Sequence, residues 1–156
     1  MSEKPILKKP VSRVAETPSL PETTPPLSSV TTNPRDLDRS RAQAAWNNIQ
    51  SVKTQDEQAK YGSLARQMPT LIQVNGLGQT LAFLKAKGNK HHKEMFNHLS
   101  IWVCSRLNLS TEKETLLDHI LKMDSQRYRL ATGESLAFLQ WVKRFAEAEL
   151  DSEDSQ

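Results

Sequence analysis

The sequence of 156 residues contains a single cysteine, only five glycines and no long run of apolar residues. One cysteine excludes an internal disulfide and fits a reducing compartment. No stretch approaches the roughly 20 apolar residues that a membrane-spanning helix needs, and the first 34 residues lack the apolar core of a secretory signal. The sequence therefore predicts a cytoplasmic protein without a membrane partner.

Proline is almost absent after residue 34, because seven of the eight prolines lie within residues 1–34. Each proline removes a backbone donor, and this stretch has too few apolar residues to offset the entropy of ordering it. We therefore predict a disordered extension, rich in proline, serine and threonine, over residues 1–34. Acidic residues near the end predict an acidic disordered tail over residues 151–156. The folded domain is expected over residues 35–150.

Residues that alternate with the period of a β-strand are also missing. From Asp36 onward apolar residues recur with a helical period, which predicts an all-α protein, a compact bundle of five or six helices. The last helix is apolar on more than one side, which is typical of a central helix or of one that contacts a partner. Two threonine–glutamate pairs have capping-box spacing, and a proline is best tolerated in the first turn of a helix. On these signals we expect helices to begin near Asp36, Thr54, Pro69, Lys90, Thr111 and Asp124.

No residues have the spacing of a catalytic or cofactor-binding site. Gly76 and Gly78 lack the preceding strand and the further residues of a phosphate-binding loop, so we expect them to allow close packing of another helix. Cys104 has no evident base beside it and is expected to be a packed thiol. The sequence therefore predicts a protein that is not an enzyme and needs no cofactor.

Three histidines, His91, His92 and His98, do not suggest a metal site. Their spacings are one, six and seven residues, whereas two ligands on one helix face are three or four residues apart. We therefore expect solvated histidines and no bound metal.

Basic residues are the strongest functional signal. Residues 35–150 contain 17 Lys and Arg against 12 Asp and Glu, a net charge of +5. Four lysines surround Gly88, where a helix is expected to end. A phosphate backbone favours such a cluster, but lysines at a helix end also complement the helix dipole and keep the surface soluble. Candidate RNA-binding residues are Lys85, Lys87, Lys90, Lys93, Arg129, Lys143 and Arg144.

Three blocks, in order, carry a resemblance to a known family. They are Arg41-Ala42 with Ala45-Trp46; the segment from Tyr61 to Gly88, including Met68-Pro69 and Asn75-Gly76-Leu77-Gly78; and the segment from Tyr128 to Glu147, including Trp141-Val142-Lys143-Arg144-Phe145. Over residues 36–149 the chain resembles the small subunit of the type III-B CRISPR (Cmr) RNA-guided effector complex. It departs from that family in its extra N-terminal residues and in Gly133, which indicates a bend or close packing.

The resemblance implies a non-catalytic antiviral subunit that stacks with neighbouring copies of itself along the backbone subunits and in line with the large subunit. It also implies a role in forming the groove for the guide RNA–target RNA. The alternative is a helical structural adaptor that binds only protein partners. A nuclease would need a metal or acid–base site, which the sequence does not supply.

Overall fold

The computed structural model describes residues 33–152, and these residues form helices and no strand. The all-α bundle of five or six helices is confirmed. Residues 1–32 and 153–156 lie outside the described residues, so the disordered extension over residues 1–34 and the tail over residues 151–156 stay predictions. No described helix has the length and low polarity needed to cross a bilayer. The helices are α1 (Pro34–Lys53), α2 (Gln58–Asn75), α3 (Leu77–Lys87), α4 (Lys90–Arg106), α5 (Leu116–Ile120) and α6 (Ser125–Glu149).

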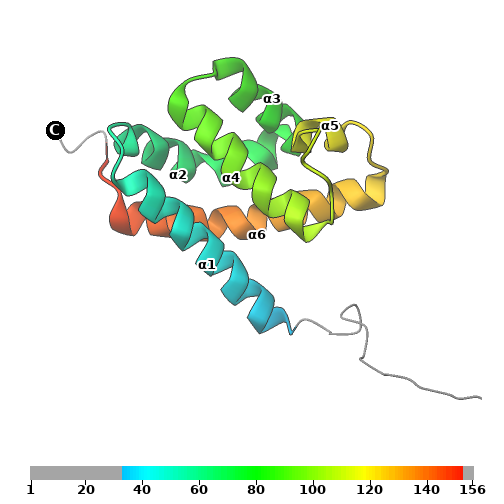
Figure 1. The fold of residues 1–156 in the computed structure, drawn as a ribbon, viewed down its shortest axis with the longest axis horizontal. Helices are drawn as coiled ribbons and strands as arrows, with labels where there is room; N and C mark the ends of the chain where they lie inside the picture. Colours follow the sequence, from blue (N-terminus) through cyan, green and yellow to red (C-terminus); the bar gives the residue numbers. More distant parts are fainter. Residues whose placement is uncertain (1–32, 153–156) are drawn as a thin grey trace, which may run out of the picture. The chain divides into compact units, whose positions relative to one another are not determined.

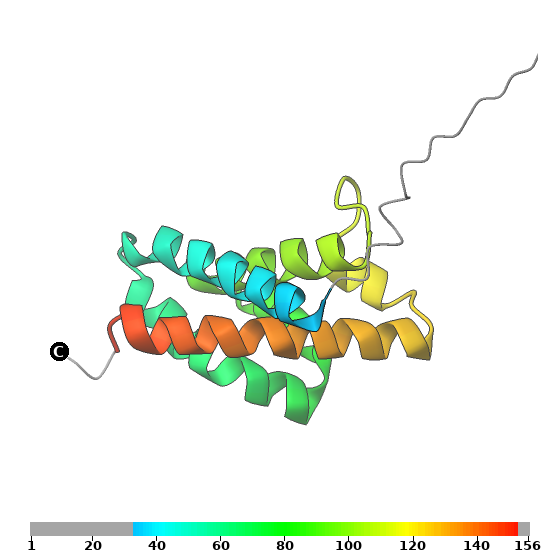
Figure 2. The ribbon, with the colours of Figure 1, turned by 90° about the horizontal axis from the view of Figure 1, so that it is seen from below.

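Helix α6 is central to the bundle. It packs against α1, α2 and α4, and Figures 1 and 2 show it running along the whole bundle with α1 beside it. This confirms that its two-sided apolar pattern marks a central helix. Phe138, fully buried, stacks on the Trp102 indole of α4 with ring centroids 5.4 Å apart. The buried residues of α6 are Ala131, Ser135, Phe138, Leu139, Val142 and Ala146.

The break between α2 and α3 falls at Gly76 and not at Pro69, so the predicted helix start at Pro69 is wrong. Pro69 lies inside α2, where its ring is buried. Its missing N–H costs α2 one hydrogen bond, but burial of the ring favours the continuous helix. Gly76 has φ 86° and ψ 160°, a conformation that residues with a Cβ almost never adopt. Gly76 therefore breaks the helix, where close helix packing was expected. Gly78 lies inside α3, and a Cβ there would come within 3.6 Å of the Ile120 side chain of α5.

Both predicted capping boxes are also wrong. Glu57 occupies the N-cap position of α2, but no side chain caps that helix. The box that forms lies one turn later than predicted: the Thr115 hydroxyl accepts from the Asp118 backbone N–H, and the Asp118 carboxylate accepts from the Thr115 backbone N–H. Hydrogen bonds from Thr115 hold the pKa of Asp118 below its usual value. The threonine–glutamate spacing at Thr54 and Thr111 was therefore insufficient to place these helix starts.

Two glycine-to-alanine substitutions are expected to act in opposite directions. Gly76→Ala should lower the free energy of unfolding by about 1–3 kcal/mol, because alanine is strained at this backbone conformation. Gly133→Ala should raise it by about 0.5–1 kcal/mol, since Gly133 is exposed within α6 and a Cβ there would meet nothing within 4 Å. That open space also contradicts the close packing suggested for Gly133. Urea denaturation of both variants provides the measurement, and a stable Gly76→Ala protein would contradict the account of this break.

Candidate nucleic-acid interface

The four lysines around Gly88 lie on the short connection between α3 and α4. Gly88 ends α3 in the left-handed conformation, with φ 67°, and its N–H donates to the Leu84 carbonyl. Helix α4 begins two residues later at Lys90. All four side chains are exposed, and none forms an ion pair with any residue between 33 and 152. We call Lys85, Lys87, Lys90 and Lys93 the basic corner.

The basic corner presents its charges in more than one direction. Lys85 and Lys93 line a shallow hollow of about 210 Å³ together with Phe96 and Asn97. The Lys87 ammonium instead lies 5.8 Å from the centroid of the Phe83 ring, within range of a cation–π interaction. A phosphate backbone passing this corner would meet ammonium groups on both sides of the connection.

Arg129, Lys143 and Arg144 do not join the basic corner. All three lie on α6, and Figure 1 shows the α3–α4 connection on the opposite side of the bundle from α6. Arg129 and Arg144 are exposed and Lys143 is half-buried. Arg129 and Lys143 are 14 residues apart, so about 21 Å separates them along the helix axis. The predicted RNA-binding residues therefore form three separate groups: the basic corner, Arg129, and Lys143 with Arg144.

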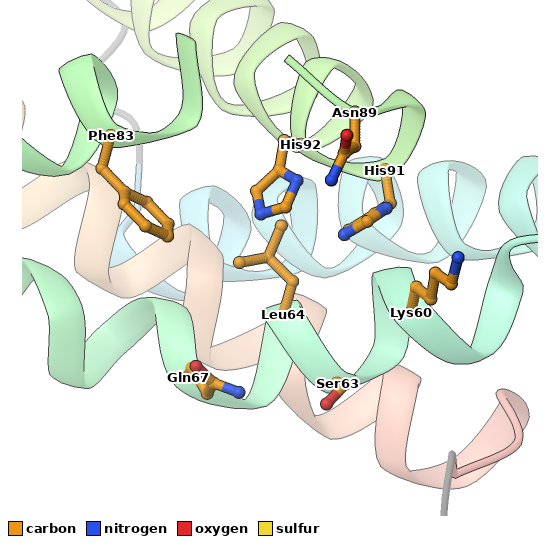
Figure 3. Close-up of a pocket in the computed structure, with 8 residues that line it drawn as sticks. All are labelled: Lys60, Ser63, Leu64, Gln67, Phe83, Asn89, His91 and His92. Atoms are coloured by element: carbon orange, nitrogen blue, oxygen red, sulfur yellow. The ribbon is translucent and has the colours of Figure 1, made fainter. Parts of the chain in front are cut away.

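An open hollow of about 350 Å³ lies beside the basic corner, between α2 and the start of α4. Figure 3 shows Ser63 and Gln67 of α2 across from His91 and His92 of α4, with Phe83 of α3 at one end. We call it the Phe83 hollow. The Phe83 side chain remains 37% exposed. Phe83 precedes Leu84 by one residue and so falls outside the buried stripe of α3, which comprises Leu77, Leu81 and Leu84. This position was the sequence signal that could have indicated its exposure.

The histidines are not solvated, contrary to expectation. His92 is only 8% exposed, and its ring lies 4.1 Å from that of His91 and edge-on to Phe83 at 5.8 Å. Burial lowers the pKa of His92, and the neighbouring His91 and Lys87 lower it further. His91 Nδ1 lies 3.1 Å from the Glu57 carboxylate. The described residues contain no group of three or more His, Cys, Asp or Glu that could hold a metal ion.

His98 lies two turns after His91 on α4 and packs against α2. Its Nδ1 is 2.8 Å from the hydroxyl of Tyr61, which is itself 1% exposed. Burial lowers the pKa of His98 to about 4. The neutral ring is therefore the form that the fold accommodates. Cys104, also on α4, is buried, and burial raises the pKa of its thiol, as expected for a packed cysteine.

Sequence reasoning missed a polar network that joins α1, α4 and α6. The Arg41 guanidinium donates two hydrogen bonds of 2.8 Å to the Glu134 carboxylate, and Trp102 Nε1 donates a third of 2.8 Å. Burial alone would raise the pKa of Glu134, but these hydrogen bonds outweigh it and hold the pKa below its usual value. In a second contact between α1 and α6, Trp141 Nε1 donates to Asp38 at 3.0 Å. Both tryptophans are half-buried anchors and not open stacking platforms.

Comparisons with known proteins agree with this architecture. Residues 37–149 match the family model described as CRISPR-associated protein Cas_Cmr5. The CRISPR system Cmr subunit Cmr5 of Thermus thermophilus is 29% identical over 107 residues, which cover 69% of this chain and 90% of that protein. The crystal structure of a CRISPR-associated Cmr5 family protein from the same organism has a TM-score of 0.64 and 28% identity, covering 73% of this chain and 96% of that one.

These likenesses place the fold in a class of small helical proteins associated with CRISPR systems. The family model spans most of the chain, from residue 37 to residue 149. The chain belongs to the Cmr5 family of CRISPR-associated proteins.

Proposed function

We propose that this chain is a non-catalytic small subunit of a type III-B CRISPR (Cmr) RNA-guided effector complex, acting in antiviral defence in the cytoplasm. Its partners would be the backbone and large subunits, neighbouring copies of itself and the guide RNA–target RNA. Family membership and the all-helical fold support the subunit role. The role in RNA binding is supported chiefly by one observation: the four lysines of the basic corner are exposed and form no ion pair with the described residues.

The lysines of the basic corner differ from three other lysines between residues 33 and 152, each of which pairs with a carboxylate. Lys53 pairs with Glu149, Lys60 with Glu57 and Lys122 with Glu114. A lysine that already neutralises a carboxylate gives little net charge to a phosphate, whereas one without such a partner can release a counterion from RNA on binding. Contacts of this kind position a strand without reading its sequence. The corner is therefore expected to hold RNA of any sequence.

The second candidate function is that of a structural adaptor that binds only protein. Exposed apolar side chains favour it: Val74, Ile101, Leu121 and Leu130 are between 61% and 75% exposed. These residues suit subunit packing, which a groove-forming subunit also requires. The two functions therefore assign different roles to the basic corner but the same role to the exposed apolar residues.

Replacing all four lysines of the basic corner by alanine should separate these functions. In a complex reconstituted with its partner subunits, the variant should still assemble, because exposed lysines contribute little to stability. Its affinity for target RNA should fall, and the slope of log affinity against log salt should become shallower by as much as about 3 per copy. The control replaces four exposed basic residues elsewhere, Arg39, Lys53, Lys113 and Lys122. Failed assembly of the corner variant, with normal RNA binding by any assembled fraction, would favour the adaptor.

A further inference from the structure

We propose that the Phe83 hollow binds one unpaired base of an RNA strand that passes the basic corner. This inference rests on the proposed function, since it assumes that the chain meets RNA. It adds a base-binding pocket to a surface otherwise expected to contact only phosphates.

The hollow has the size and the aromatic wall that a base requires. Its volume of about 350 Å³ lies within the range of small-molecule sites, and a single base fits it. Phe83, which is 37% exposed, lines the hollow, and its ring meets the ring of His92 edge-on, with centroids 5.8 Å apart. Two rings from two helices thus form a wall on which a base can stack, and stacking on exposed aromatic rings is a general means of holding single-stranded RNA.

The polar groups around this wall are unused. Ser63, Gln67 and Asn89 line the hollow, and their side chains form no hydrogen bond with another residue between 33 and 152. Asn89 occupies the N-cap position of α4 without capping it. Figure 3 shows one ring nitrogen of His92 pointing over Leu64 into the space between α2 and α4. Amides, a hydroxyl and an imidazole supply both donors and acceptors, as the polar edge of a base requires.

The charges favour a neutral base in the hollow with its phosphates outside. At one end Glu57 pairs with Lys60 at 3.8 Å and with His91 at 3.1 Å, so this end has little net charge and would not attract a wholly anionic ligand. At the other end Lys87 lies over Phe83, and its ammonium has no carboxylate partner among the described residues. The base is therefore expected between these ends, with the flanking phosphates on Lys87 and Lys90.

The test compares two single-stranded RNAs of the same length, one of uridines and one in which every nucleotide is abasic. Both have the same number of phosphates. We expect the full-length chain at low salt to bind the uridine RNA about 5- to 100-fold more tightly than the abasic RNA. Phe83→Leu keeps an apolar side chain but removes the ring, and should abolish most of this difference. Gln67→Ala changes an exposed residue and is the substitution with the smaller risk to the fold. It should reduce the difference in affinity between the two RNAs.

A control and a second readout make the outcomes distinct. Trp46→Leu alters a ring on α1 that is 37% exposed, as Phe83 is, but lines neither the Phe83 hollow nor the hollow at Lys85 and Lys93; it should keep the preference for uridine RNA. In RNA containing thiouridine, photocrosslinks should map to α3 near Phe83 and to the start of α4. Equal binding of the two RNAs, both weakened by lysine substitution, would overturn the pocket and leave the proposed function standing. No binding of either RNA, by the chain or by its assembled complex, would contradict both.

Discussion

Replacing Glu134 by alanine is expected to lower the free energy of unfolding by about 3–5 kcal/mol. The side chains of Arg41 and Glu134 are only 16% and 12% exposed. Removing the carboxylate would take away the main partner of the guanidinium and the acceptor of the Trp102 indole N–H, and a poorly compensated charge in such a place is costly. Denaturation in urea would measure the loss.

Glu149→Ala is the matched control for this prediction. Glu149 also links α6 to α1, through Lys53, but the lysine side chain is 46% exposed. An exposed pair contributes about 0–1 kcal/mol, so this variant should remain close to the wild type. Glu134→Gln, which keeps an acceptor for Trp102, should fall between the two alanine variants. Equal losses for Glu134→Ala and Glu149→Ala would show that the buried network does not hold α1 on α6.

Acidification is expected to destabilise the protein through His98. Its pKa is about 4 in the fold, against an ordinary value of about 6.5. The unfolded chain therefore binds more protons than the folded chain between these two values. Stability rises with pH wherever the unfolded state binds more protons, so the contribution of the neutral ring is complete at about pH 7 and is lost as pH falls from about 6.5 to 4. The loss corresponds to roughly 3 kcal/mol.

The measurement is the free energy of unfolding of the wild type and of His98→Gln at several pH values across this window. Glutamine cannot take up a proton, so the variant should lose less stability on acidification. His92 also has a lowered pKa and contributes a dependence of the same sign, which is common to both proteins and cancels in the difference. Parallel pH profiles for the two proteins would contradict the role given to His98.

Local sequence signals predicted the helices well and their boundaries less well. The all-helical class and the apolar residues on both sides of α6 follow from periodicity alone. The helix break at Gly76 could not be predicted from periodicity. The sequence does not show that the Pro69 ring is buried within α2, nor that Gly76 has the positive φ that ends the helix. Threonines with the spacing of caps occur at several places, but tertiary contacts decide which of them caps a helix.

The basic corner was accessible to sequence reasoning because Gly88 and its four lysines are neighbours in the chain. The Arg41–Glu134 pair was not, since 93 residues separate its members and nothing in either helix alone shows that the two residues meet. The Phe83 hollow also depends on the fold, because it brings together residues of α2, α3 and α4. The spacing of the three histidines along α4 can be read from the sequence. The α2 side chains that bury them cannot, because they come from another part of the chain.

The most direct test of a groove-lining role is lysine footprinting in the reconstituted complex. Exposed lysines would be acetylated and their modification measured by mass spectrometry in the free chain, in the complex, and in the complex with target RNA. The account predicts that Lys85, Lys87, Lys90 and Lys93 stay reactive on assembly and become protected when target RNA is added, while Lys53 and Lys122 do not change with RNA. Protection of the basic corner on assembly alone, with no further change on adding RNA, would contradict it.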